Sequence, residues 1–131
     1  ITVDYTAAFA DMVKKFSPNA TFCFLSGAGA DSTEKSRVSF AKYKGMAENY
    51  LLKTLEDVYV FRPGYIYPVE KRKEPNFMYK ISRALYPLLK LLVKSATIKS
   101  TELGLAIYKT GINGNEKKVL ENIDMIQMLE K

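Results

Sequence analysis

Histidine is missing from all 131 residues, and the chain has a single cysteine, Cys23. The absence of histidine excludes Ser-His-Asp and Cys-His catalysis and every His-ligated metal site. One cysteine can form neither an internal disulfide nor a thiolate zinc site, so we predict no metal and favour a reducing, cytoplasmic location. Because Cys23 lies inside an apolar run, we expect a buried thiol there rather than a nucleophile.

Long hydrophobic runs are also missing. No uninterrupted apolar stretch approaches the roughly 20 residues of a membrane span, and no signal peptide is visible. The net charge is +6, but the positive charge is scattered, and its densest run (71–73) lies between two glutamates. A nucleic-acid partner is not predicted, because neither a basic stripe with stacking aromatics nor a recognition helix is evident. The composition, 47% apolar and 26% charged, is typical of one globular domain over 1–131.

The first half of the chain predicts alternating helices and strands. Apolar spacing predicts a helix over 4–16, and short apolar runs bounded by turn signals predict strands over 21–25 and 58–61. We expect these strands to be covered on both faces. A single helix over about 34–55 separates them, which predicts parallel pairing with a right-handed crossover. The 21–25 strand is expected at an edge of the sheet, free to pair with a further neighbour.

The second half predicts more helix than strand. After residue 64 the chain is expected to be irregular as far as about residue 75, because two prolines interrupt it. The fold class is therefore α/β: a partial, doubly wound parallel sheet of two or three strands with extra C-terminal helices. The later elements expected are helices over about 76–85 and 87–95, a helix from 100 or 101 to about 109, a short strand over 118–121, and a helix from 123 or 124 to 129.

Four segments carry a family resemblance through their order. The first predicted strand ends in Ser26-Gly-Ala-Gly-Ala-Asp31, and the following helix has Phe40 four residues before the segment Lys44-Gly45-Met46-Ala47-Glu48. The second strand ends in Arg62-Pro63-Gly64, and Val119-Leu120-Glu121-Asn122 follows late in the chain. In this order they resemble the C-terminal half of the NAD(P)-binding Rossmann domain of atypical, epimerase-like short-chain dehydrogenase/reductases, a subgroup of uncharacterised bacterial oxidoreductases. The resemblance covers nearly the whole chain.

The resemblance implies roles for particular side chains. Lys44 would bind the nicotinamide ribose hydroxyls, Ser26 would hold the substrate, and the Arg62-Pro63-Gly64 turn would lie beside the nicotinamide. Residues four apart share one helical face and reach one pocket, which is why the family pairs a tyrosine with this lysine. Here the tyrosine position holds Phe40, which has no hydroxyl to donate.

Simpler readings of the same residues stay open. Phe40 can belong to a packing face, Lys44 can be a surface lysine, and Arg62-Pro63-Gly64 can be only a turn after a strand. A replacement hydroxyl could come from Tyr65 or Tyr67, just past that turn.

The cofactor expectation depends on a segment that this sequence does not contain. Dinucleotides bind across both halves of a Rossmann domain, with the pyrophosphate on a Gly-rich turn of the first half. The turn after Ser26 could imitate it, but Asp31 and Glu34 would repel phosphate. We therefore expect NAD or NADP binding by a longer protein that carries the N-terminal half, and weak or no binding by this chain alone.

Three functions follow as alternatives. The first is an NAD(P)-dependent oxidoreductase or epimerase-like protein acting on an unidentified small molecule, and the second is a non-catalytic NAD(P)-binding sensor or regulatory protein. The third, a membrane-surface or partner-binding module, derives from the apolar, cationic segment 79–94, for which a lid or packing helix is the simpler reading. A homo-oligomer is expected, formed through the helices at 4–16 and 34–55.

Overall fold

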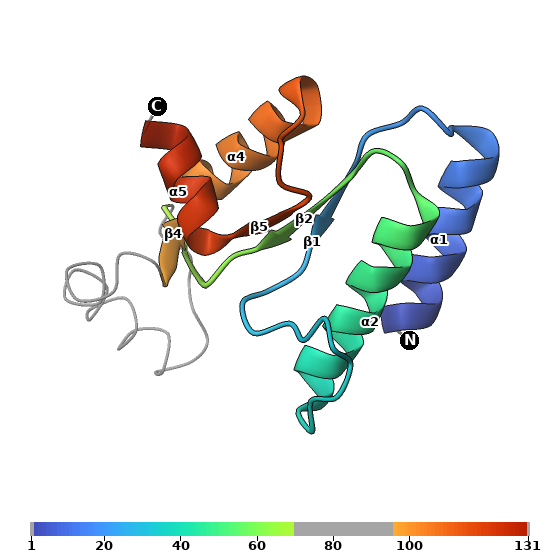
Figure 1. The fold of residues 1–131 in the computed structure, drawn as a ribbon. Helices are drawn as coiled ribbons and strands as arrows, with labels where there is room; N and C mark the ends of the chain where they lie inside the picture. The colour runs from blue at the N-terminus through green and yellow to red at the C-terminus, as the bar shows by residue number, and fades with distance from the viewer. Residues whose placement is uncertain (1, 70–95, 131) are drawn as a thin grey trace.

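The computed structural model describes residues 2–69 and 96–130 and confirms an α/β fold built on a small parallel sheet (Figure 1). The sheet has the order β1-β2-β5, so β1 and β5 are its edges. Both pairings are parallel, as the single-helix crossover predicts for the first of them. Its strands are β1 (Phe22–Leu25), β2 (Val58–Arg62) and β5 (Val119–Glu121).

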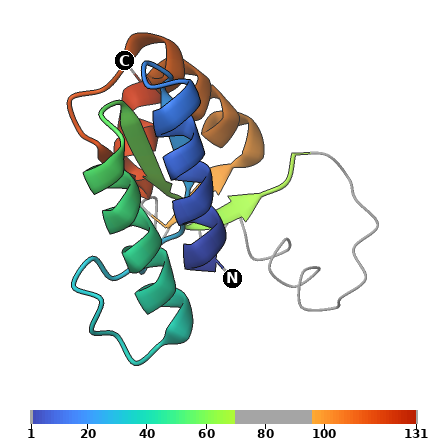
Figure 2. The ribbon, with the colours of Figure 1, turned by 90° about the vertical axis from the view of Figure 1, so that its right-hand side faces the viewer.

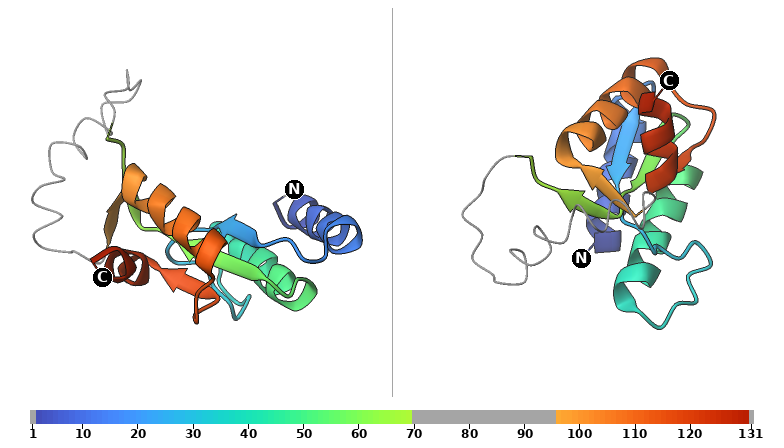
Figure 3. Two further views of the ribbon diagram at one scale, coloured as in Figure 1. Left: turned by 90° about the horizontal axis from the view of Figure 1, so that it is seen from above. Right: turned by 90° about the vertical axis from the view of Figure 1, so that its left-hand side faces the viewer.

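Helices cover the sheet on both faces. Figure 2 looks onto α1 (Thr2–Phe16) and α2 (Ser39–Thr54), which lie side by side in front of the strands. On the opposite face lie α4 (Ser100–Asn113) and α5 (Asn122–Glu130), as the view from above in Figure 3 shows. The predicted strand at 118–121 and the last helix are thus confirmed, while the expected helices over 76–85 and 87–95 lie outside the described residues.

The prediction of irregular chain directly after residue 64 is wrong. Residues Tyr65–Tyr67 form β3, which pairs in parallel with β4 (Thr97–Lys99) in a second, two-stranded sheet. β-branched and aromatic residues favour strands, and Pro68 follows the pairing without interrupting it. Gly64 allows the chain before β3 to lie close to Ala96, just before β4, because a Cβ at position 64 would lie 2.1 Å from the carbonyl oxygen of Ala96.

Two helix boundaries differ from the sequence-based expectation. The helix expected from about residue 34 begins at Ser39, because the Asp31 carboxylate accepts hydrogen bonds from the amides of Thr33, Lys35 and Ser36 and holds that segment as a loop. The helix expected to end near Lys109 continues to Asn113. It ends there because Gly114, at φ 72°, donates its amide to the carbonyl of Thr110.

The core lies on both faces of β2, which is buried along most of its length. One cluster joins the sheet to α4 and α5, and a second joins it to α1 and α2. The edge strand β1 contacts both clusters, the second through Phe22 and Phe24 and the first through Cys23, so it is covered on both faces as expected, but its residues are only partly buried and Leu25 is exposed. The two clusters include Phe61, Ile98, Leu103, Leu120 and Met125 on the first side, and Ala10, Leu51, Leu55 and Val58 on the second.

Gly45 sets the distance between α2 and the loop before it. A Cβ at this position would lie 1.8 Å from the carbonyl oxygen of Asp31, so even a methyl group forces backbone to move. We expect Gly45→Ala to lower the free energy of unfolding by about 3 kcal/mol or more, measured by urea denaturation. Gly104→Ala on α4 is the matched control, because nothing lies within 4 Å of its Cβ, and it should be neutral or stabilise the fold by up to about 1 kcal/mol. Equal losses from both variants would contradict this packing.

Candidate functional site

The carboxyl ends of β1 and β2 meet at one edge of the parallel sheet, the edge at which open α/β sheets bind ligands. Glu48 of α2 is the fully buried centre of this edge. Arg62, the last residue of β2, donates from Nε to both Glu48 carboxylate oxygens at 3.1 Å, and from Nη2 to Oε2. Ser26, directly after β1, donates its hydroxyl to Glu48 Oε1. The buried carboxylate is therefore paired and hydrogen-bonded, which offsets its desolvation.

Arg62 also reaches two further elements. Its Nη1 donates to Glu121 Oε1 of β5 at 2.9 Å, and its Nη2 donates to the Ser32 hydroxyl at 2.7 Å. Hydrogen bonds to Glu48 first, and then to Glu121, raise the pKa of Arg62 above its ordinary value against the opposing effect of burial. One permanently charged guanidinium thus connects β2, α2, β5 and the loop after β1.

Lys44 and Phe40 lie at the carboxyl end of β1, as their four-residue spacing predicts. Lys44 Nζ donates to the carbonyl of Leu25 at 3.3 Å and lies 5.1 Å from the centre of the Phe24 ring. The Phe40 ring lies against Gly27, where an added Cβ would be 3.0 Å from the ring. The structure therefore brings both residues to the same strand end, with Phe40 about half exposed.

Ser26 reaches the expected strand end, but its hydroxyl faces Glu48. A hydroxyl has one proton, and here that proton is donated to a carboxylate. While this bond lasts, Ser26 can accept a hydrogen bond but cannot donate one to a substrate carbonyl.

The Arg62-Pro63-Gly64 turn is held by contacts within the protein. The guanidinium of Arg62 is occupied by Glu48 and Glu121, and the Pro63 carbonyl accepts the amide of Ala28 at 2.9 Å. Gly64 donates its amide to Asn122 Oδ1 at 2.9 Å, and the same side chain donates Nδ2 to the carbonyl of Thr97. These contacts join the turn to β4 and α5.

Sequence reasoning assigned no role to Glu48, Glu121 or Asn122. A signal for Glu48 existed, because it lies seven residues after the buried Ala41 and three before the buried Leu51, on the apolar face of α2. An acidic residue on such a face needs a cationic partner, and the arginine that ends the next strand was available. Glu121 and Asn122 belong to the segment 119–122 that carries the resemblance, but their contacts could not be read from it, because their partners are distant in sequence.

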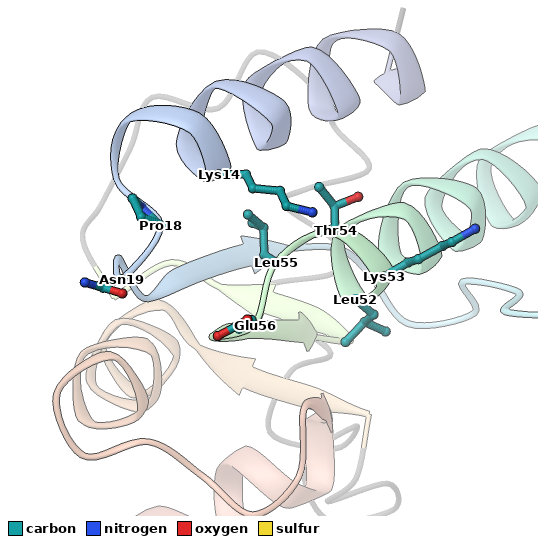
Figure 4. Close-up of a pocket in the computed structure, with 8 residues that line it drawn as sticks. All are labelled: Lys14, Pro18, Asn19, Leu52, Lys53, Thr54, Leu55 and Glu56. Carbon is teal, nitrogen blue, oxygen red and sulfur yellow. The ribbon is translucent and has the colours of Figure 1, made fainter.

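A hollow lies at the opposite end of the sheet, where its strands begin (Figure 4). Lys14 of α1 extends across it toward Thr54, where α2 ends. The C-terminal carbonyls of α1 and α2 point to this region and carry partial negative charge, which opposes anion binding by its lysines. We therefore place the candidate site at the carboxyl edge.

Within residues 2–69 and 96–130, no three acidic or cysteine side chains form a group that could hold a metal ion.

Burial first, and then the charge of Asp57, raises the pKa of the Cys23 thiol, so the thiol is protonated at neutral pH. None of the helices in the same ranges is both long and apolar enough to cross a bilayer.

The chain matches no protein-family model and no curated protein. The resemblance to short-chain dehydrogenase/reductases therefore stays a prediction from the residues.

The Glu48–Arg62 pair provides a direct test of the site's architecture. Arg62→Met should leave the Glu48 carboxylate buried without its partner and lower the free energy of unfolding by about 3–5 kcal/mol, measured by urea denaturation. Adding Glu48→Gln to Arg62→Met should recover part of this loss, because the buried charge is removed. Lys118→Met, which breaks an exposed pair with Asp57, is the control and should change stability by about 1 kcal/mol or less. A loss from Arg62→Met no larger than the control's would contradict a buried, coupled pair.

Proposed function

We propose that this chain is the substrate-side half of an NAD(P)-binding α/β protein, an oxidoreductase or epimerase-like protein of the short-chain dehydrogenase/reductase type. The observation that carries the proposal is the position of Lys44. Its ammonium group lies at the carboxyl end of a parallel strand, and its hydrogen bond to the Leu25 carbonyl is long, at 3.3 Å. A ribose hydroxyl could replace that carbonyl as acceptor without leaving a buried charge unpaired, since Lys44 is only half buried.

The residues at this edge fit a bound nicotinamide nucleotide only in part. A nicotinamide cofactor supplies hydride transfer when bound, while the protein supplies orientation and proton transfer. Lys44 would donate hydrogen bonds to the ribose, and the exposed Phe40 ring offers an apolar wall beside Gly27. Proton transfer has no donor at Phe40, and the Ser26 proton is held by Glu48.

A second candidate is a non-catalytic cofactor-binding sensor or regulatory protein. It is favoured by the same lack of an available proton donor at Phe40 and Ser26. Both hydroxyl functions that the family chemistry uses are missing or engaged: Phe40 has none, and that of Ser26 is donated to Glu48. Binding would then be the whole function of the site. The two candidates share Lys44 and differ in whether a proton donor operates near it.

Nicotinamide mononucleotide tests the Lys44 role, because it contains the part of the cofactor expected at this edge and lacks the adenylate. We expect millimolar or weaker binding, with amide chemical-shift changes in residues 25–28 and at Lys44, followed by NMR. Lys44→Met should reduce the affinity at least about tenfold, because a charged donor is lost. Lys42→Met is the control, an exposed lysine two positions away on the same helix. Equal effects of the two variants on the titration would refute this role for Lys44.

Phe40→Tyr tests whether the site keeps the electrostatics of a proton-transfer centre. The introduced phenol would lie one helical turn from the Lys44 ammonium, which should lower the phenol pKa by about half a unit to one unit below 10. The sign follows because a nearby positive charge favours the phenolate. Carbon-13 NMR of labelled tyrosine can resolve this phenol from the nine native ones. Lys44→Met in the same background should return the pKa toward 10, and a phenol insensitive to Lys44 would show that the two residues do not act as a pair.

A further inference from the structure

Glu48 is a fully buried acid that neither candidate function uses. Its carboxylate accepts hydrogen bonds from Arg62 Nε at 3.1 Å to both oxygens, from Arg62 Nη2, and from the Ser26 hydroxyl. Because a guanidinium has only donors, the Glu48 oxygens that face it must accept, and the group carries its negative charge. An ionised carboxylate has no proton, so the Ser26–Glu48 bond runs in one direction only, from serine to glutamate.

Ser26 is the residue through which this buried acid can act on a ligand. Ser26 is 9% exposed, whereas Glu48 is not exposed at all. The neighbours of Ser26 in the chain are more open, since Leu25 is 46% exposed and Gly27 is partly exposed. A ligand at the carboxyl edge of the sheet can therefore contact the serine but not the acid behind it.

The bond to Glu48 gives the Ser26 hydroxyl a fixed polarity. A hydroxyl has one proton and two lone pairs, and here the proton is committed to Glu48. Donation to a charged group also polarises the hydroxyl, which makes its oxygen a better acceptor. A ligand carbonyl offers only lone pairs and would face those of Ser26. A ligand hydroxyl or amine can instead donate a hydrogen bond to them.

Ser32 shows that this polarity is a property of Ser26 and not of every serine beside the ion pair. The Ser32 oxygen accepts a hydrogen bond from Arg62 Nη2 at 2.7 Å, so the Ser32 proton is not used in that bond. The acid of the pair thus fixes one serine as an acceptor, while the base leaves the proton of the other serine uncommitted.

We propose that Glu48 is a positioning residue for ligand recognition: it holds Ser26 as a hydrogen-bond acceptor, so that the ligand group that meets Ser26 is a hydroxyl or an amine and not a carbonyl. For an oxidoreductase of the proposed type, this selects the alcohol form of the substrate over the ketone form. The inference rests on the proposed function in one respect, that a small molecule binds at this edge. It depends neither on Lys44 nor on a cofactor.

Glu48→Gln should invert the polarity of Ser26 while keeping the size of the side chain. Glutamine has one accepting oxygen and one donating nitrogen. The oxygen should take the place of Oε2, which receives two of the bonds from Arg62, and the nitrogen then faces Ser26. Ser26 would accept from the glutamine, and its own proton would be available to a ligand carbonyl. Arg62 keeps its ion pair with Glu121 in this variant.

Cyclohexanol and cyclohexanone test the proposal, because they share a ring and differ in the one group that would meet Ser26. Each is titrated into the full chain to about 100 mM, and the amide resonances of Ser26 and Gly27 report binding at this position by nitrogen-15 NMR. In the wild-type chain the alcohol should bind about three- to tenfold more tightly than the ketone, as expected for one hydrogen bond. In Glu48→Gln the order should reverse.

Two further variants separate polarity from a general effect on the ion pair. Glu121→Gln is the matched control, because it removes a charge from the same arginine without touching Ser26, and it should keep the preference for the alcohol. Ser26→Ala should abolish the preference, which tests the proposal even if Glu48→Gln does not fold. Circular dichroism reports the folding of each variant.

Several outcomes overturn the proposal. These are a preference for the ketone in the wild-type chain, an unchanged order in a folded Glu48→Gln variant, a preference for the alcohol that survives in Ser26→Ala, and no response of Ser26 and Gly27 to either probe. None of them bears on Lys44, whose role is decided by the titration with nicotinamide mononucleotide. Failure of this inference and failure of the proposed cofactor site are therefore distinguishable.

Discussion

The buried carboxylate of Glu48 is the constraint on which the carboxyl edge of the sheet depends. A charge in this position must be paired, and Arg62 meets the requirement while also bonding Glu121 and Ser32. Because the arginine ends β2 and Glu48 belongs to α2, the pair fixes where the helix lies along the sheet. The Ser26 hydroxyl completes the carboxylate's contacts. The elements that meet at the candidate site are thus held by one ion pair and its neighbours.

The same network limits what the site can do chemically. Two of the groups expected to meet a ligand, the Ser26 hydroxyl and the Arg62 guanidinium, are engaged by Glu48. Lys44 remains the group best able to exchange its partner, because it bonds a backbone carbonyl at the rim. Proton transfer and binding are therefore separable at this edge. Phe40 has no hydroxyl, and neither the Glu48–Arg62 pair nor the Lys44 contact requires one, which is why a binding role without catalysis is a coherent alternative.

Sequence reasoning succeeds here where a property is local and fails where it depends on tertiary partners. The parallel sheet follows from short apolar runs separated by a long helix, and Phe40 and Lys44 lie together because they are one turn apart. The β3–β4 sheet was missed because its strands have three residues each and are distant in sequence. The start of α2 was placed too early because the Asp31 side chain binds amides that a helix would otherwise use. The direction of the Ser26 hydroxyl required knowing where Glu48 lies.

The apolar face of α1 shows that spacing predicts a helix more readily than it predicts contacts. The pattern over 4–16 gave the helix, but it did not indicate which of its apolar residues pack inside the chain. In the structure, the small residue Ala10 is buried against the sheet and α2, and Val13 is partly so. The aromatic residues of α1 lie further round the helix and are exposed. The arc of apolar residues on α1 is therefore wider than its contacts within the described residues require, and α4 carries a similar exposed row, Leu105, Tyr108 and Ile112. Exposed apolar rows are a property of surfaces that take part in a further contact, so the amphipathic pattern predicts each helix but does not identify the partner of its apolar residues.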